Sequence, residues 1–244
     1  MLEQLDTEIA QDGVVAVEET IEKTKVQERE IKIVVKGGKA YSFFKRAFDI
    51  FCSFLAIIVL SWFLLIMAIL VKVTSKGPVL FKDKRVGRNG KEIKVYKFRS
   101  MYVDAESRLR EYLTEEQYQN WLVERKIDND PRITKLGKFI RKTSIDELPQ
   151  LFNILKGDMS IVGPRPITKL EIDLNFTEEE RKILLLARPG LTGYWQVYGR
   201  SDVDYASGER QRLELEYYSH RGFWFDIKLI LLTVPAVLKS KGAQ

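Results

Sequence analysis

Residues 141–166 read RKTSIDELPQLFNILKGDMSIVGPRP, and this stretch decides the fold that the chain is expected to adopt. Apolar residues at positions 148, 151, 152 and 155 recur at helical spacing, and Gly157 follows as a helix stop. Asp146 and Glu147 stand where this helix is predicted to begin. Unpaired N–H groups and the dipole of a helix N-terminus favour negative charge by ~0.3–1 kcal/mol at an exposed site, so we expect Asp146 to be ionised at neutral pH.

Two arginines flank this pair of carboxylates. Arg141 precedes Asp146 by five residues, and Arg165 lies in a Gly-Pro-Arg-Pro turn whose two prolines fix the backbone. The planar guanidinium suits bidentate contact with phosphoryl oxygens, so the arrangement indicates a phosphate clamp. An Asp-Glu pair at the start of a helix is more often a simple cap, and taken alone the pair would be interpreted in that way.

Three runs of sequence together resemble the bacterial sugar transferases, which are monotopic phosphoglycosyl transferases. They are KFRSM at 97–101, NDPRIT at 129–134 followed by Gly137 and the stretch quoted above, and PGLTGYWQVYGR at 189–200. The resemblance extends in order from about residue 43 to about residue 240, without large gaps. A match of this length is a specific signal.

The resemblance implies a reaction. Such enzymes move a sugar 1-phosphate from a UDP-sugar to undecaprenyl phosphate and release UMP, with galactose and glucose as the expected sugars. By position, Asp146 would be the nucleophile that forms a phosphosugar ester, Glu147 would be its partner, and both would bind Mg²⁺. Trp195 could stack on uracil or pack in the core. The implied substrate-binding residues are Lys97, Arg99, Arg141, Arg165, Arg188, Gln196 and Arg200.

Residues 50–71 form a run of 22 positions without a charged side chain. As a helix this run would be ~33 Å long, enough to cross a bilayer core of ~30 Å. Lysines and arginines lie on both sides of it, so the positive-inside rule gives no orientation. The family resemblance implies a re-entrant helix, bent by a Ser-Pro pair, whose two ends stay on the cytoplasmic face.

The expected proline is absent, because Trp62 follows Ser61. Ser61 can still bond a backbone carbonyl one turn back and bend the helix, though less strongly than proline would. We therefore expect a re-entrant helix and keep a straight transmembrane helix as the alternative. Residues 223–238 are apolar apart from Asp226 and Lys228, and at 16 residues they suit an interfacial helix better than a span.

Between these apolar segments the chain carries other local signals. Asn89-Gly90 is a strong hairpin turn between alternating segments, which predicts a small two-stranded ribbon. Its interleaved cations and aromatic rings could bind single-stranded nucleic acid, but an apolar segment directly upstream favours a diphosphate or a lipid headgroup. Residues 104–126 predict an amphipathic helix, and Thr177 with Glu180 form a capping box. Residues 188–200 are glycine-rich and suit a loop that contacts a nucleotide.

Composition limits the chemistry. The formal net charge is +6, with an acidic segment at 1–40 and a basic remainder, which suits an anionic partner. Cys52 is the single cysteine and His220 the single histidine. These counts exclude an intramolecular disulfide and a zinc site built of cysteine and histidine, so acid–base chemistry must use carboxylates.

These observations predict a mainly α monotopic membrane protein with a small β-ribbon, a re-entrant helix and interfacial amphipathic helices. The expected parts are an acidic tail at 1–40 of unknown role, an anchor at 41–76 and a catalytic domain at 77–244 on the cytoplasmic face of a bacterial membrane. The chain would be a short form of the family that initiates capsule, exopolysaccharide or glycoprotein glycan synthesis. We expect no nucleic-acid partner, and the sequence leaves homo-oligomer formation open.

Two alternatives stay open at this point. The first is a membrane-anchored basic protein that binds nucleic acid or anionic lipid without catalysis, and it predicts steep salt dependence and indifference to Asp146. The second is an enzyme that transfers a different phosphoalcohol from a cytidine nucleotide. Competition by UMP or by CMP would separate this enzyme from a UDP-sugar transferase.

Overall fold

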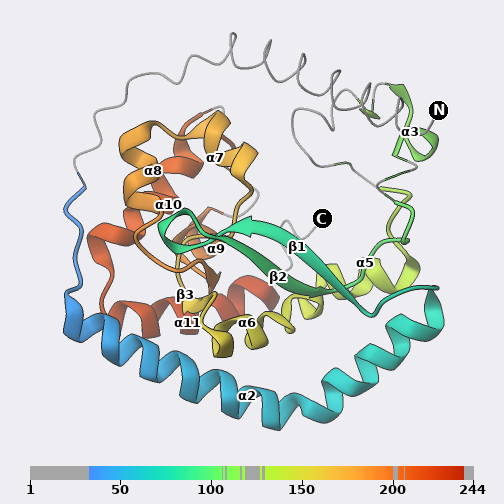
Figure 1. The fold of residues 1–244 in the computed structure, drawn as a ribbon, viewed down its shortest axis with the longest axis horizontal. Coiled ribbons are helices and arrows are strands. Elements are labelled where there is room, and N and C mark those ends of the chain that lie inside the picture. Colours follow the sequence, from blue (N-terminus) through green and yellow to red (C-terminus); the bar gives the residue numbers. More distant parts are fainter. Residues whose placement is uncertain are drawn as a thin grey trace.

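The structure is a computed structural model, which describes residues 33–105, 107, 109–115, 117, 118, 127, 130–199, 203–205 and 207–238. Its helices are α2 (Lys39–Thr74), α3 (Leu109–Tyr112), α5 (Lys135–Lys142), α6 (Gln150–Lys156), α7 (Lys169–Asn175), α8 (Glu178–Leu184), α9 (Tyr194–Tyr198), α10 (Glu209–His220) and α11 (Phe223–Leu238). Its strands are β1 (Leu80–Val86), β2 (Glu92–Phe98), β3 (Ser160–Val162) and β4 (Gly190–Thr192), with 3₁₀ turns η1 (Arg88–Gly90) and η2 (Ile145–Glu147). The predicted mainly helical fold is confirmed (Figure 1). Predictions for most of residues 1–40, for 11 of the 23 residues in 104–126, including 119–126, and for Asn129 and Arg200 lie outside the described residues.

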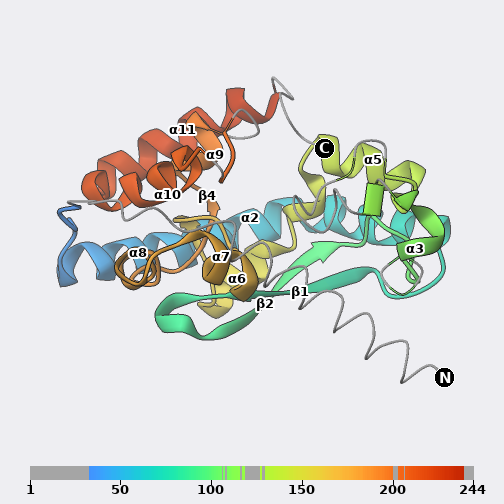
Figure 2. The same cartoon turned by 90° about the horizontal axis from the view of Figure 1, so that it is seen from above.

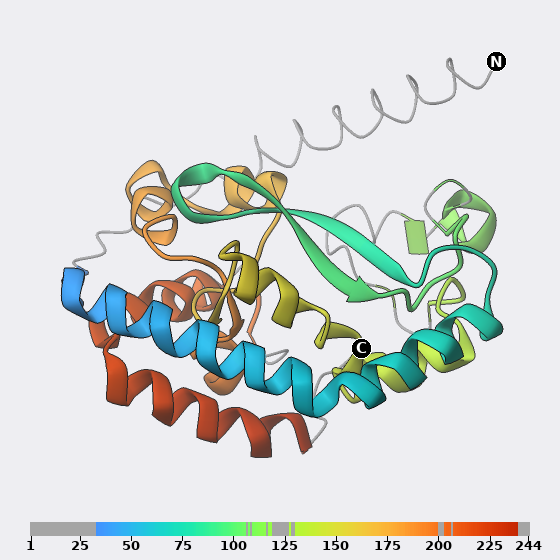
Figure 3. The same ribbon diagram turned by 60° about the horizontal axis from the view of Figure 1, so that its bottom comes forward.

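Helix α2 runs along one side of the molecule and is bent near its middle, so that both of its ends turn toward the other elements (Figures 1 and 3). Within it, Ser61 Oγ donates a hydrogen bond to the Ile58 carbonyl at 2.8 Å, which is the bond one turn back that the sequence predicts. Serine bonds of this kind bend helices. The chain therefore forms a bent apolar helix without proline.

The two faces of α2 have different surroundings. On the inner face Leu64, Met67 and Val71 pack with Phe98 and Ile140 in one core cluster. Apolar side chains on the outer face are exposed, including Phe51, Phe54, Ile58, Val59, Trp62, Leu65, Ile69 and Val73. The helix is long and apolar enough to cross a membrane. Because these large side chains are exposed together, α2 presents a surface suited to lipid.

Polar contacts also join α2 to the body of the protein. Asp49 accepts hydrogen bonds from Ser160 Oγ at 2.8 Å and from the Ile161 backbone at 3.0 Å, both on β3. Arg46 donates to the Ile154 carbonyl at 2.6 Å, near the C-terminal end of α6. A cation at that end satisfies carbonyls that the helix leaves free. Helix α2 and the remainder of the chain thus share one interior.

Helix α11 lies beside the first half of α2 (Figure 3). Asp226 joins the two helices, because its Oδ2 accepts from Lys45 Nζ at 2.7 Å and from the Tyr41 hydroxyl at 2.8 Å. The rings of Phe48 and Phe223 meet edge to face at 5.8 Å. Apolar side chains of α11 that stay exposed are Phe223, Trp224, Leu231 and Val234. Seen from above, α10 and α11 lie on one side of α2 and the β1–β2 hairpin lies on the other (Figure 2).

Strands β1 and β2 form the predicted two-stranded ribbon. They pair antiparallel, with Leu80 opposite Phe98 and Val86 opposite Glu92. Asn89 in the connecting turn has φ of 58°, a left-handed conformation that asparagine tolerates. Buried residues of β2 pack on α6, so the ribbon is fixed on the helix that follows the Asp-Glu pair.

A second sheet, which the sequence did not predict, joins β3 and β4 in parallel. Residues 188–200 were expected to form a loop, but they contain β4 and α9. The glycines serve close backbone approach, since a Cβ atom on Gly190 would lie 2.2 Å from the Gly163 nitrogen. The predicted capping box of Thr177 and Glu180 is present at the start of α8.

Candidate active site

Glu147 is held from two directions. Lys97, near the end of β2, places its Nζ 3.3 Å from Glu147 Oε1. Gln150, in the first turn of α6, is buried and lies close enough to the Glu147 side chain to lower its pKa. Burial raises the pKa of Glu147, but the charges of Lys97 and Arg165 and the polar contacts of Lys97 and Gln150 outweigh burial and hold its pKa below the ordinary value. Glu147 is therefore a fixed anion.

Asp146 differs from its neighbour. It is only 8% exposed, and burial together with the negative charge of Glu147 raises its pKa to about 6, although Lys97 and Arg141 act in the opposite direction. The Asp146 carboxyl is still mostly ionised at pH 7. The two adjacent carboxylates thus have pKa values that are displaced in opposite directions, as in sites that assign different roles to paired acids.

The prediction that Asp146 lies at the N-terminus of a helix, and is ionised for that reason, is wrong. Asp146 lies in the 3₁₀ turn η2, and α6 begins four residues later at Gln150. Ser144 before the turn has φ of 57° and its side chain caps nothing. The residue before α6 is Pro149, which carries no N–H. The carboxylates therefore do not cap α6. Neighbouring cations keep Glu147 ionised, whereas Asp146 is ionised at pH 7 because its raised pKa of about 6 still lies below that pH.

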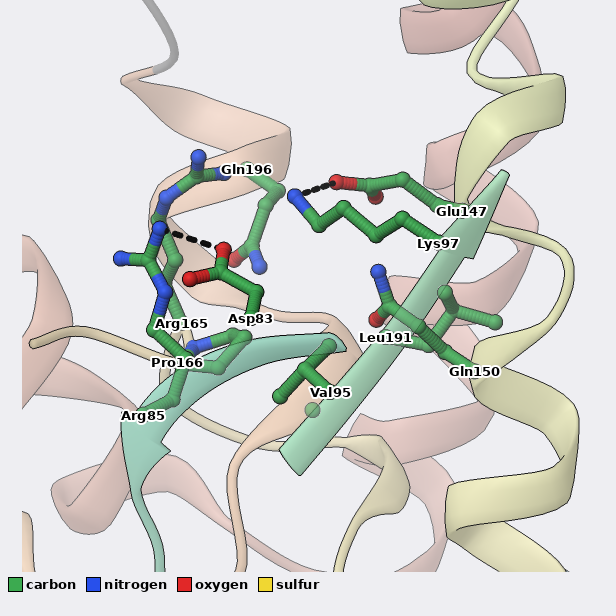
Figure 4. A pocket seen from close by; sticks show the side chains of 11 residues that line it. Asp83, Arg85, Val95, Lys97, Glu147, Gln150, Arg165, Pro166, Leu191 and Gln196 are labelled. Atoms are coloured by element: carbon green, nitrogen blue, oxygen red, sulfur yellow. Dashed lines mark hydrogen bonds and ion pairs between the residues drawn. The ribbon is translucent and has the colours of Figure 1, made fainter. Parts of the chain in front are cut away.

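A hollow open to solvent lies beside Glu147 (Figure 4). Figure 4 shows Lys97 and Glu147 on one side of it, with Asp83, Arg165 and Gln196 facing them from the other. Its polar lining residues are Asp83, Arg85, Lys97, Glu147, Gln150, Arg165 and Gln196. Four of these, Lys97, Glu147, Arg165 and Gln196, are sequence-predicted site residues that the fold brings together.

Sequence reasoning missed Asp83, Arg85 and Gln150. The signal for the first two was present in the alternation of the ribbon. Residues at 83 and 85 share a face of β1, and the register places Asp83 opposite Val95 and one pair away from Lys97. Gln150 could be predicted as a site residue only if the first residue of α6 were already known.

Two further predicted arginines, Arg141 and Arg99, make their hydrogen bonds outside the hollow. Arg141 donates from Nε to Ser100 Oγ at 2.8 Å, and its charge acts on Asp146. Arg99 is 6% exposed and donates from Nη2 to the carbonyl and hydroxyl of Ser75, each at 2.8 Å, in the loop after α2. Arg141 is thus placed beside the candidate nucleophile, whereas Arg99 is engaged by the loop that ends the apolar helix.

Arg188 and Trp195 have surroundings other than the hollow. Arg188 donates from Nε to the Gly157 carbonyl at 2.7 Å, at the opposite end of α6 from Gln150. Trp195 is 9% exposed, and the guanidinium carbons of Arg165 and Arg210 lie 5.1 Å and 4.6 Å from the centre of its ring. This burial favours packing over stacking on a base, so Trp195 supports Arg165.

The carboxylates of the site suit a metal ion that is bound together with the substrate better than one that is held by protein ligands alone. Among the described residues, no group of three or more acidic, histidine or cysteine side chains could hold a metal ion. Mg²⁺ is commonly bound by one or two carboxylates together with substrate phosphates and water. Asp146 and Glu147 beside a cation-lined hollow match that pattern.

Comparison with known proteins agrees with this geometry. Residues 40–240 match the sequence model of the bacterial sugar transferase family, and the chain therefore belongs to that family. The resemblance drawn from the sequence motifs is confirmed.

Three relatives illustrate the match. The chain is 45% identical over 204 residues to the undecaprenyl-phosphate galactose phosphotransferase of Salmonella typhimurium, covering 82% of this chain and 42% of that protein. It is 41% identical over 210 residues to the exopolysaccharide production protein ExoY of Rhizobium meliloti, covering 85% and 89%. It is 41% identical over 208 residues to the UDP-glucose:undecaprenyl-phosphate glucose-1-phosphate transferase of Escherichia coli, covering 82% and 41%. The chain thus spans about two fifths of the length of the Salmonella and Escherichia proteins.

Proposed function

We propose that this protein transfers a sugar 1-phosphate from a UDP-sugar to undecaprenyl phosphate and releases UMP, as the first step of capsule or exopolysaccharide synthesis. The observation that carries the proposal is the meeting of the Asp146–Glu147 pair with Lys97, Arg141 and Arg165 beside a bent apolar helix. Cations on both sides of a carboxylate pair suit a diphosphate. The names of the Salmonella and Escherichia relatives support this reaction class.

In the proposed mechanism, an Asp146 carboxylate oxygen attacks the phosphorus that carries the sugar, and the bond to the leaving UMP breaks. The resulting aspartyl phosphosugar is then attacked by an oxygen of undecaprenyl phosphate, which frees Asp146 and forms the diphosphate-linked product. A covalent step of this kind divides one difficult displacement into two. Arg141 and Lys97 would balance the negative charge around Asp146.

Glu147 stays ionised between Lys97 and Gln150, so its carboxylate is in the form that binds a cation. Asp146 and Glu147 would hold Mg²⁺, which neutralises charge on the donor diphosphate when bound. Arg165, supported by Trp195, would bind phosphoryl oxygens from across the hollow.

We further propose that α2 is a re-entrant helix and that α11 lies in the membrane interface, with the site on the cytoplasmic face. The bend of α2, its exposed apolar face and the neighbouring exposed side chains of α11 support this placement. Cysteines introduced at Ser42 and Lys76, in a protein with Cys52 replaced by serine, should react with an impermeant reagent from the same side of the membrane. Reaction from opposite sides would establish a straight span.

The test of the reaction is nucleotide release by detergent-purified protein with Mg²⁺, with and without undecaprenyl phosphate, from UDP-galactose, UDP-glucose and UDP-N-acetylgalactosamine. We expect lipid-dependent UMP release, and Asp146→Asn should lower it by more than about 10³-fold. Asp173→Asn, which changes an exposed carboxylate that pairs with Arg181 and does not line the hollow, should leave it unchanged. UMP release that persists in Asp146→Asn would reject the nucleophile, and salt-sensitive nucleic-acid binding without UMP release would favour the basic binding protein.

A further inference from the structure

Asp83 projects into the hollow although nothing in the proposed chemistry uses it. It lies on β1 opposite Val95, one pair away from Lys97 on the same face of the ribbon. Diagonal neighbours of this kind are separated by roughly 7–8 Å. Figure 4 shows its carboxylate turned toward Arg85, with Gln196 nearby.

A chain of polar contacts fixes this carboxylate. Asp83 Oδ2 accepts from Arg85 Nη2 at 2.7 Å, and Arg85 Nη1 donates to Glu171 Oε2 at 3.2 Å. Glu171 is held in turn by the Thr168 backbone and hydroxyl, at 2.8 Å and 2.9 Å. Asp83 Oδ1 accepts no hydrogen bond from any described residue, and Asp83 is one of the residues that line the hollow. One oxygen of Asp83 is thus anchored and the other is available.

The charge of Asp83 decides what it can bind. A carboxylate repels phosphate, so the diphosphate must lie nearer to Lys97 and Arg165, and Asp83 must face an uncharged part of the donor. A carboxylate oxygen is a strong acceptor for hydroxyl groups. Gln196, whose Oε1 is buried without a hydrogen bond, brings an amide to the same place. These groups suit a ring that carries neighbouring hydroxyls.

The transferred sugar and the ribose of the donor both carry such hydroxyls, but their distances from the reacting phosphorus differ. The sugar is bonded directly to the phosphate that Asp146 would attack, whereas the ribose lies one phosphate further away. Asp83 is a diagonal neighbour of Lys97, which already contacts Glu147. We propose that Asp83 accepts hydrogen bonds from hydroxyl groups of the transferred sugar and thereby discriminates among UDP-sugars, an inference that rests on the function proposed above.

The experiment compares Asp83→Asn, Asp83→Glu and the control Asp173→Asn with the native protein, for UDP-galactose and UDP-glucose as donors and UMP as a competitive inhibitor. We expect Asp83→Asn to lower kcat/KM for the favoured donor by about 10- to 100-fold, mainly through KM, and to bring the two donors closer together. Asp83→Glu keeps the charge but displaces the carboxylate, so it should also change the donor ratio. The inhibition constant of UMP should not change.

Each outcome separates the possibilities. A donor ratio that is unchanged in an active Asp83→Asn or Asp83→Glu variant would overturn the inference, and the second variant keeps the test valid where the first does not fold. Binding of UMP that weakens as much as binding of the donors would assign Asp83 to the ribose instead. UMP release from no donor by the native protein would remove the proposed function and this inference together, whereas an unchanged ratio in an active variant would remove only the inference.

Discussion

Glu214 offers a quantitative test of the electrostatics behind the site. It lies on α10 and is 2% exposed; its Oε2 accepts a hydrogen bond from the Arg165 backbone at 3.0 Å, and its Oε1 is buried without one. Burial raises the pKa of Glu214 from an ordinary 4.5 to about 6, although Arg165 and Arg210 oppose the rise. The folded protein therefore binds this proton more tightly than the unfolded chain does.

The sign and size of the effect on stability follow from this difference. Below pH 4.5 the carboxyl is protonated in both states and adds no penalty, and as the pH rises through 6 that advantage is lost. A displacement of this size corresponds to about 2 kcal/mol at pH 7.5. Glu214→Gln cannot ionise, so its unfolding free energy relative to the native protein should rise by about 2 kcal/mol between pH 4 and pH 7.5.

Thermal unfolding of detergent-solubilised protein at the two pH values measures this change. For a chain of this length, ~2 kcal/mol corresponds to a difference of roughly 4–8 °C in Tm. Glu178→Gln on α8 is the matched control, because Glu178 is exposed and pairs only with Lys182 among the contacts of the described residues. If Glu214→Gln and the native protein differ by the same amount at both pH values, the carboxyl is not desolvated as the structure indicates.

Three further predictions concern packing and support. Gly137→Ala would place a Cβ atom 1.9 Å from the Ser100 carbonyl oxygen, so we expect a loss of about 3 kcal/mol or more, visible as poor yield or a low Tm; near-native Tm would contradict the close approach. Arg46→Met removes two hydrogen bonds to the C-terminal end of α6 and should lower stability by about 2 kcal/mol, and an unchanged Tm would show that these bonds contribute little. Trp195→Ala should raise KM for the donor by about 3- to 10-fold because Arg165 loses its support, whereas Trp195→Phe should change KM less; equal KM values in the two variants would argue against that support.

Local signals in the sequence predicted local structure well. Asn89-Gly90 identified the hairpin because a left-handed turn is encoded by the two residues that form it. Thr177 and Glu180 identified the start of α8 for the same reason. The apolar run at 50–71 indicated one long helix, and the bond made by Ser61 within it was also foreseen.

Features that depend on residues far apart in the chain were not predictable in this way. The β3–β4 pair joins segments about thirty residues apart, and the glycines that permit it resemble those of a loop. The contact of Arg188 was not predictable for the same reason, because its hydrogen-bond partner, the Gly157 carbonyl, is identified only by the fold. The chemistry of Asp146 was recognised from its motif, but its raised pKa depends on burial beneath other elements. Asp83 was missed because the sequence does not show that the β1–β2 ribbon and the turn at Arg165 line the same hollow.

The contacts of α2 have a consequence for how such a protein can be handled and can evolve. Asp49 and Arg46 bond to β3 and α6, and Leu64 and Met67 complete a cluster with Phe98. Deletion of the helix would uncover that cluster and leave buried donors without acceptors, so a water-soluble fragment is not obtained by cutting after residue 76. For the same reason a foreign anchor could not be grafted in its place unless its inner face matched residue by residue. The apolar helix and the site must therefore be inherited as a single unit.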